Sequence, residues 1–108
     1  MIWQVTVFES GRGEKIIEKF IKKLNPSTIA KIAKEIDLLE QYGSYLGMPH
    51  SKKINVGLYE LRIRGKEEVR LLYSFKSNKI HILNVFKKQT KKTPRKEVLI
   101  ALSRLTKI

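Results

Sequence analysis

The chain has 108 residues, enough for one compact core and too few for two, so we predict a single domain over residues 1–108. Its 23 Lys and Arg against 10 Asp and Glu give a formal net charge of +13, which favours nucleic acid over an acidic small molecule as the partner. The lack of cysteine excludes a disulfide framework and a thiolate metal site, and two histidines alone cannot form a zinc site. We therefore predict neither a metal nor a cofactor.

The first residues have the pattern of a strand. Residues 2–8 alternate roughly between apolar and polar side chains, whereas a signal peptide would show a continuous apolar block. No apolar run in the sequence approaches the ~20 residues that span a bilayer. We predict a cytoplasmic protein with no membrane partner.

Two amphipathic helices are predicted next. From residue 14 to residue 24, apolar side chains recur at helical spacing with charges between them. Asn25 and Pro26 then suit the cap and the first turn of a second helix, and Gly43 suits its end. The two helices should form a hairpin, and their apolar stripes require a surface to pack on.

The rest of the chain has the pattern of strands followed by one helix. Residues 43–55 show no sustained period and are predicted to form a surface loop that could contact RNA. Residues 58–64, 69–76 and 80–86 are predicted strands joined by short polar turns, and a last helix begins at residue 93. The order βααβββα predicts an α+β fold of two layers, with a mostly antiparallel sheet and with helices packed on one face.

Charged side chains interrupt the predicted strands. Because alternate side chains of a strand share a face, Glu60, Arg62 and Arg64 should point one way, and Arg70 of the next strand can join them. Neighbouring guanidinium groups repel each other unless an anion lies among them, which favours a bound phosphate. The alternative for any single arginine is an edge-strand charge that deters aggregation.

Lysines gather after the last predicted strand. Residues 55–108 carry 14 basic and 4 acidic side chains, a net charge of +10, whereas residues 1–54 carry 9 and 6, a net charge of +3. A lysine run is often only solvated charge, but beside an arginine face it can follow a phosphate backbone. The lysines in question are Lys87, Lys88, Lys91 and Lys92, and the predicted loop adds His50, Lys52 and Lys53 as RNA contacts.

The residue types favour cleavage of RNA without a metal ion. Asp37 is the only aspartate, and no compact set of carboxylates that could hold two metal ions is visible. His81 has apolar residues at alternate positions and is predicted to be a half-buried structural histidine. Cleavage would use the ribose 2′-hydroxyl as nucleophile and arginines to stabilise the transition state, with Glu60 or a lysine of lowered pKa as the proton acceptor.

The strand region contains three short motifs. They read GLYELR at 57–62, VRLLY at 69–73, and FKK through KTP at 86–94. Together they resemble the HigB-like, often phage-derived branch of the RelE toxin superfamily. The resemblance implies a type II toxin that enters the ribosomal A site, cuts mRNA and inhibits translation. It also implies a HigA-like helix-turn-helix antitoxin as partner, and contact with operator DNA only through that antitoxin.

The resemblance also assigns roles by position. Arg62 and Arg70 match basic residues of the family's second and third strands, and Lys88, with Lys87, matches the basic residue after the last strand. Asn84 stands where the branch commonly has histidine, and the C-terminal tyrosine of some relatives has no counterpart. The implied catalytic residues are Arg62, Arg70, Lys87 and Lys88. Glu60 departs from the family, because some relatives have a basic residue at this site, and it is a catalytic candidate only as the proton acceptor named above. Arg64, Lys52, Lys53, His50, Lys91 and Lys92 are assigned to RNA binding.

Two functions of different classes follow from the sequence. The first is a ribosome-dependent mRNA endonuclease, and the second is a non-catalytic RNA- or ribosome-binding module that uses the same basic face. Net charge does not separate them. A DNA-binding regulator is disfavoured, because the basic residues lie on strands and a loop and no recognition helix is evident.

Overall fold

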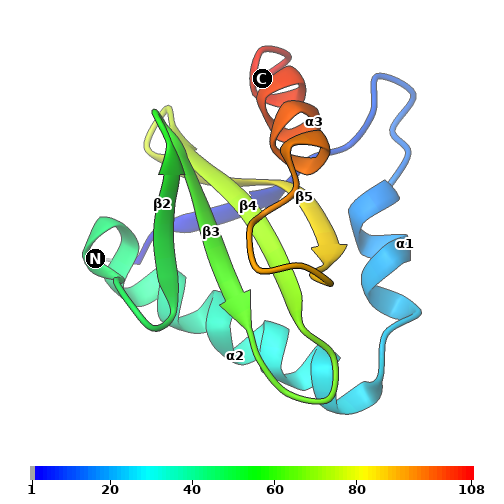
Figure 1. The fold of residues 1–108 in the computed structure, drawn as a ribbon. Helices are drawn as coiled ribbons and strands as arrows, with labels where there is room; N and C mark the ends of the chain where they lie inside the picture. The colour runs from blue at the N-terminus through cyan, green and yellow to red at the C-terminus, as the bar shows by residue number, and fades with distance from the viewer. Residues whose placement is uncertain (1) are drawn as a thin grey trace.

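The computed structural model describes residues 2–108, which form a mixed sheet with helices on both of its faces (Figure 1). The predicted strands and helices are all present, with ends that differ from the stated predictions by at most two residues. In chain order the elements are β1 (Gln4–Val7), α1 (Ile16–Lys22), α2 (Pro26–Tyr42), the 3-10 helix η1 (Gly43–Tyr45), β2 (Ser51–Asn55), β3 (Leu58–Ile63), β4 (Val69–Lys76), β5 (Lys79–Lys87) and α3 (Arg95–Leu105).

The described part of the chain has one five-stranded sheet in the order β1-β5-β4-β3-β2. Strand β1 pairs in parallel with β5, and the other neighbours are antiparallel. Strands β4 and β5 are joined by Ser77 and Asn78, which both have positive φ, of 55° and 61°. A two-residue hairpin turn of this kind matches the twist of the strands that it joins. The sheet is mostly antiparallel, as predicted.

Helix α2 begins and ends where the sequence predicts. Pro26 lies in its first turn, and Gly43 follows its last residue with φ 53°. A side chain at this position is also excluded by space, because a Cβ on Gly43 would lie 2.1 Å from the indole Nε1 of Trp3. The end of α2 is therefore fixed both by the backbone and by the packing of Trp3 from the N-terminal segment.

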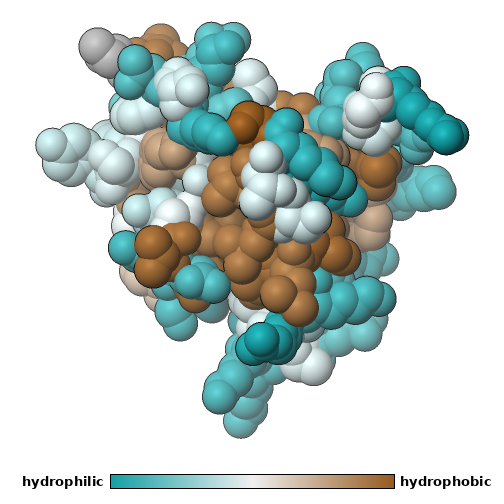
Figure 2. All heavy atoms as spheres, turned by 90° about the horizontal axis from the view of Figure 1, so that it is seen from above, coloured by the Kyte–Doolittle hydropathy of each residue, from teal (hydrophilic) through white to brown (hydrophobic). Residues whose placement is uncertain are grey.

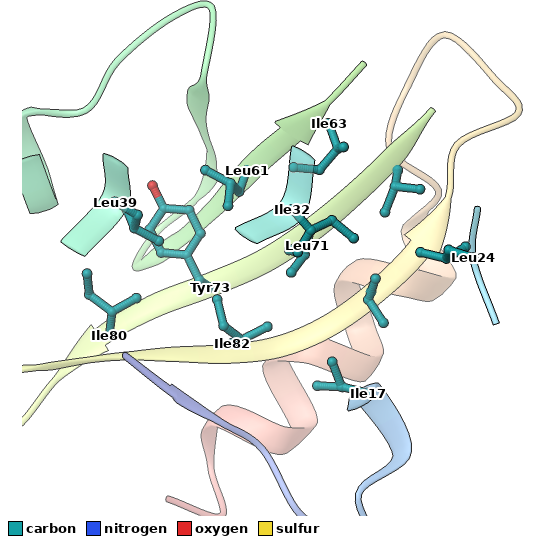
Figure 3. Packing of buried hydrophobic residues seen from close by; sticks show 12 residues of the cluster. Ile17, Leu24, Ile32, Leu39, Leu61, Ile63, Leu71, Tyr73, Ile80 and Ile82 are labelled. Carbon is teal, nitrogen blue, oxygen red and sulfur yellow. The ribbon is translucent and has the colours of Figure 1, made fainter. Parts of the chain in front are cut away.

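Helices α1 and α2 cover one face of the sheet and form the larger apolar core with it. Figure 3 shows Ile17 of α1 and Leu39 of α2 among side chains of β3, β4 and β5. The strand residues of this core occupy alternate positions, as the pattern predicts. They include Leu61, Ile63, Val69, Leu71, Tyr73, Ile80 and Ile82, which are at most 1% exposed.

Helix α3 lies on the opposite face, which corrects the prediction that the helices share one face. Its Ala101 packs with Leu58, Leu72, Leu83 and Phe86 in a second, smaller apolar cluster. Figure 1 shows α2 running behind the sheet and the chain that leads into α3 crossing in front of it. Both faces of the sheet are thus partly covered. On the face that points away from α1 and α2, α3 covers the apolar residues of the second cluster.

The cluster beneath α3 leaves apolar surface open. Leu99 of α3 is 51% exposed, and Val56, in the β2–β3 turn, is 86% exposed. Figure 2 looks down on the end of the molecule where α3 and this turn lie, and shows apolar residues in the middle of the face with hydrophilic side chains around them.

Strand β2 is a second correction, because residues 51–55 were predicted to belong to a loop. The strand pairs with β3 at the edge of the sheet, with Lys52 opposite Glu60 and Lys53 opposite Tyr59. Two adjacent lysines hide the alternation in so short a segment, and such charges are common on edge strands. The strand fixes both lysines relative to the arginines of β3.

Among the helices of residues 2–108, none combines the length and the apolar character that crossing a membrane would require.

Candidate nucleic-acid interface

The centre of the site is built by the pairing of β3 with β4. Arg62 lies directly opposite Arg70, and Glu60 lies opposite Leu72. Leu72 belongs to the cluster beneath α3, so these charged side chains point to the α3 face. The prediction that Arg62 and Arg70 share one face of the sheet is confirmed.

A buried carboxylate lies between the two arginines. Glu60 is 2% exposed, and its Oε1 lies 3.6 Å from Nε of Arg70 and 4.0 Å from Nε of Arg62. The hydroxyl of Thr93, in the segment between β5 and α3, donates a hydrogen bond to Oε2 of Glu60. A single carboxylate therefore compensates two cations and also fastens the connection to α3 onto the sheet.

Arg70 lies beneath the surface. Its side chain is 2% exposed, and its Nη1 donates to the carbonyl oxygens of Val69 at 2.9 Å and Ile63 at 3.3 Å. Its Nη2 donates to Oε1 of Glu68 at 3.1 Å. Arg70 is thus held through both of its terminal nitrogens, while its Nε makes no hydrogen bond, and it supports the site from below. The prediction that it grips a phosphate directly does not fit its burial.

Above this layer is a hollow of about 420 Å³, which we call the basic groove. Glu60 and Arg62 form its floor, β2 forms one wall, and the connection between β5 and α3 forms the other. Its cationic side chains come from elements that are far apart in sequence. The residues that line it are Lys52, Lys53, Ile54, Glu60, Arg62, Lys88, Lys91, Lys92, Thr93 and Val98.

Lys88 has an altered acidity in this setting. Partial burial lowers its pKa, and the positive charges of Arg70, Arg62 and Lys52 lower it further, while the carboxylate of Glu60 acts in the opposite direction. A lysine whose pKa is lowered is neutral for a larger share of the time at a given pH, and only the neutral amine can accept a proton. Lys88 thus matches the lysine of lowered pKa that the sequence raised as an alternative to Glu60.

Besides Arg70, which lies beneath it, three predicted residues lie outside the basic groove. Nζ of Lys87 forms an ion pair with Oε2 of Glu67 at 2.9 Å, and Lys87 pairs across the sheet with Val69, whose side chain faces α1 and α2. His50 and Arg64 line a different hollow, beside α2. The structure thus separates Lys87 from Lys88, although the two are adjacent in sequence.

Sequence reasoning missed the residues that close the groove. Thr93 was read only as the start of a helix, and Ile54 and Val98, which form apolar parts of the walls, were not assigned to the site. Asn84, which stands where the HigB-like branch commonly has histidine, donates to the backbone carbonyl and to Oε1 of Glu97 at 3.1 and 3.0 Å. It therefore anchors α3 instead of facing the groove. The one signal in the sequence for this wall of the groove was the KTP motif at residues 92–94, which contains Thr93.

Within residues 2–108, no group of three or more His, Asp or Glu side chains is arranged to hold a metal ion. The predicted histidine His81 is half-buried and lies near the hydroxyl of Thr6, with 3.0 Å between Oγ1 and Nδ1, which agrees with a structural role.

The sheet order, the two helices on one face and the basic groove define a protein with a RelE-like α+β fold, as predicted from the sequence. A chain of the YoeB-YefM complex from Staphylococcus aureus has the same fold, with a TM-score of 0.55. The two chains are 21% identical, and the match covers 83% of this chain and 100% of that one. No curated protein matches the sequence.

The family itself is shown by the sequence pattern. Residues 19–106 match the family described as phage derived protein Gp49-like (DUF891), and the chain belongs to this family. The resemblance to a phage-derived group with a RelE-like fold is confirmed at this level. Membership of the HigB branch stays a prediction.

Proposed function

We propose that this protein is the toxin of a type II toxin-antitoxin system and that it cuts mRNA on the ribosome in the cytoplasm. The basic groove carries the proposal, since it gathers five lysines and Arg62 around one carboxylate that is already neutralised. Membership of the Gp49-like family and the fold shared with a chain of the YoeB-YefM complex support it.

The proposed reaction is a transesterification at phosphorus. The ribose 2′-oxygen attacks the adjoining phosphorus while the bond to the 5′-oxygen breaks, which leaves a 2′,3′-cyclic phosphate and a 5′-hydroxyl. The 2′-hydroxyl gives its proton to a base, and the leaving 5′-oxygen takes a proton from an acid. Negative charge builds on the phosphoryl oxygens in the transition state, and fixed cations stabilise it there more than in the ground state.

We assign these tasks to different residues of the groove. Arg62 is placed to bind the scissile phosphate, and Lys88 is the candidate for proton transfer because its pKa is lowered. Glu60 is too deeply buried to meet a ribose, so we assign it, with Arg70, to positioning Arg62. The remaining lysines of the groove, Lys52, Lys53, Lys91 and Lys92, are assigned to the RNA backbone.

This chemistry needs no metal ion. A divalent cation in a nuclease is held by free carboxylates, and the carboxylate among the lining residues, that of Glu60, already faces two arginines and Thr93. The cationic side chains themselves supply the positive charge that a metal would supply.

We further propose an antitoxin as the protein partner. The S. aureus structure is described as a complex of YoeB with YefM, and the resemblance of the sequence implies a HigA-like helix-turn-helix protein. In this proposal the toxin contacts operator DNA only through that partner.

The test compares two adjacent lysines. In a translation reaction with purified ribosomes, Lys88→Ala and Arg62→Ala should each lower the rate of mRNA cleavage by roughly 100- to 1,000-fold, as expected when a group that stabilises the transition state is removed. Lys87→Ala is the matched control, because Lys87 pairs with Glu67 away from the groove, and it should keep most of the activity. Mapping of 5′ ends should show fragments that begin with a 5′-hydroxyl.

The outcome also decides between the two functions. A wild-type protein that binds ribosomes but leaves translated mRNA intact would overturn the endonuclease proposal in favour of the non-catalytic binding module. Equal loss of cleavage in the Lys87 and Lys88 variants would overturn the assignment of Lys88.

A further inference from the structure

A second hollow of about 260 Å³ lies on the other side of Arg62, between α2 and the end of β3. We call it the α2-side hollow. Four cations line it, and two of them, Lys31 and Lys34, belong to α2 and were not assigned any role from the sequence. The charged lining residues are Lys31, Lys34, Arg62, Arg64 and Glu35, with His50 beside them.

The carboxylate of this hollow is engaged with a histidine. Nδ1 of His50 lies 2.9 and 3.0 Å from the two carboxylate oxygens of Glu35. Glu35 is 17% exposed and His50 is 39% exposed, so the pair forms part of the wall. This single carboxylate stands against four cations, so the hollow keeps an excess of positive charge.

One of these lysines is held in place by the turn between β3 and β4. Nζ of Lys31 donates to the carbonyl oxygen of Arg64 at 2.9 Å. It also occupies the space left by the missing side chain of Gly65, where a Cβ would lie 2.2 Å from Nζ. The ammonium group is thus positioned over the turn and still has hydrogen-bond donors left for an anion.

Arg62 connects the two hollows, since it lines both of them. Its Nε faces Glu60 at 4.0 Å on the side of the basic groove, and its Nη1 lies 3.5 Å from Sδ of Met48. The side chain is 13% exposed, so its guanidinium forms the partition between them. A polyanion bound in the basic groove therefore meets further cations directly beyond Arg62.

We infer that the α2-side hollow is a second phosphate subsite, which binds the backbone of the same RNA strand beyond the scissile phosphate. The inference rests on the proposed function for the identity of the ligand as single-stranded RNA. Lys31, Lys34 and Arg64 bind the phosphate in this subsite, and Arg62 contacts the strand from between the two hollows. Cations placed in a row along a strand add affinity without reading its sequence.

The experiment measures how the affinity depends on RNA length. Fluorescence anisotropy would follow binding of 2′-O-methyl oligonucleotides, which lack the nucleophile for cleavage, with lengths of about three and about ten nucleotides to bracket the site sizes of single-strand binders. The variant is Lys31→Ala with Lys34→Ala. The matched control is Lys19→Ala with Lys22→Ala, which removes two exposed lysines of α1 that line neither hollow.

The expected result is a loss that is specific to the long strand. The Lys31 and Lys34 variant should bind the short strand like the wild type and the long strand more weakly. Its slope of log affinity against log salt should be smaller by at most about 0.7, because the subsite binds one phosphate and each phosphate contact on a single strand contributes about 0.7. The control should change both affinities equally and only slightly.

A second variant tests position instead of charge. Gly65→Ala keeps every cation but displaces the ammonium of Lys31, a flexible group that can move without strain, so it should weaken binding of the long strand alone. Equal losses for both lengths, a control as weak as the variant, or no measurable binding by the wild type would each overturn the inference. Failure of the endonuclease proposal would be seen separately, as intact mRNA on ribosomes in the presence of a protein that still shows this length dependence.

Discussion

The two faces of the sheet are formed by the same strands but are held together by different interactions. Within residues 2–108, twelve buried apolar residues form the cluster on the side of α1 and α2, whereas five form the cluster beneath α3. The α3 face also contains buried charged groups, those of Glu60 and Arg70. The first face therefore follows the usual pattern of a protein core, and the second combines a small core with a network of charges.

This difference indicates a division of tasks. Apolar burial stabilises a fold in proportion to area, whereas buried ions lose hydration that their mutual attraction repays only in part. A chain under selection for stability alone has no need of Glu60 and Arg70 in its interior. Under the proposed function, their value lies in fixing Arg62 at the floor of the basic groove, where a misplaced cation would stabilise the transition state less.

The largest expected effect comes from removing one member of the buried charge network. Glu60→Met should lower the free energy of unfolding by about 3 kcal/mol, the lower end of the range for a broken buried ion pair, because Nε of Arg70 loses the carboxylate of Glu60 while Nη2 keeps that of Glu68. Urea denaturation followed by circular dichroism measures this change. The double variant Glu60→Met with Arg70→Met should regain most of the loss, since both charges are then absent.

The double variant separates a charge effect from a packing effect. If it is as unstable as Glu60→Met alone, the α3 face depends on packing like the other face, and the contrast between the two faces is lost. Cleavage should stay low in both variants, because Arg62 is no longer positioned.

The sequence predicted most of the fold because the alternation of residue types is strong where strands are buried. Residues 58–63 and 69–76 place apolar side chains on one face at every second position, and the structure has these strands. The side taken by α3 could not be predicted, because an amphipathic helix fits either face of a sheet and the path of the connection decides between them. Strand β2 was missed because an edge strand needs few apolar residues.

The sequence predicted which face of the sheet the charged side chains point to, but not which of them are buried. Alternation places Glu60, Arg62 and Arg70 on one face, yet it does not tell which side chain another segment covers. Thr93 covers Glu60 through a contact between residues 33 positions apart, which no local pattern reveals. The separation of Lys87 from Lys88 was open to prediction, because β5 continues to Lys87 and adjacent residues of a strand point to opposite faces.

A medium effect is expected from a hydroxyl pair on the apolar face. The hydroxyl groups of Ser51 and Tyr73 are hydrogen-bonded in the interior, and burial raises the pKa of Tyr73 to about 12. Ser51→Ala should lower the free energy of unfolding by about 1–3 kcal/mol, because it leaves the buried phenol without this partner. Chemical denaturation of the variant against the wild type measures the change.

The control for this pair removes both hydroxyl groups. Ser51→Ala with Tyr73→Phe should be more stable than Ser51→Ala alone, since no polar group is then left unpaired. Removing both hydroxyl groups from this face should leave mRNA cleavage unchanged, whereas removing both charges of Glu60 and Arg70 from the α3 face should abolish it. A double variant less stable than either single variant would show that the hydroxyl pair is needed for more than its mutual hydrogen bond.

The smallest expected effect concerns acid stability at the rim of the α1 and α2 face. Hydrogen bonds from Lys87, from the backbone N–H of Asn25 and from the hydroxyl of Thr28 together lower the pKa of Glu67 from its usual 4.5 to about 2. A depressed carboxyl pKa stabilises the fold above the unfolded value, and this contribution is lost as the pH falls from 4.5 towards 2. Unfolding free energies measured across this range should fall less steeply in Glu67→Gln than in the wild type, whereas the exposed Glu9→Gln should follow the wild type. Identical pH profiles for all three proteins would mean that the ties from Glu67 to α2 and β5 do not contribute to stability, and that the α1 and α2 face is held by apolar packing alone.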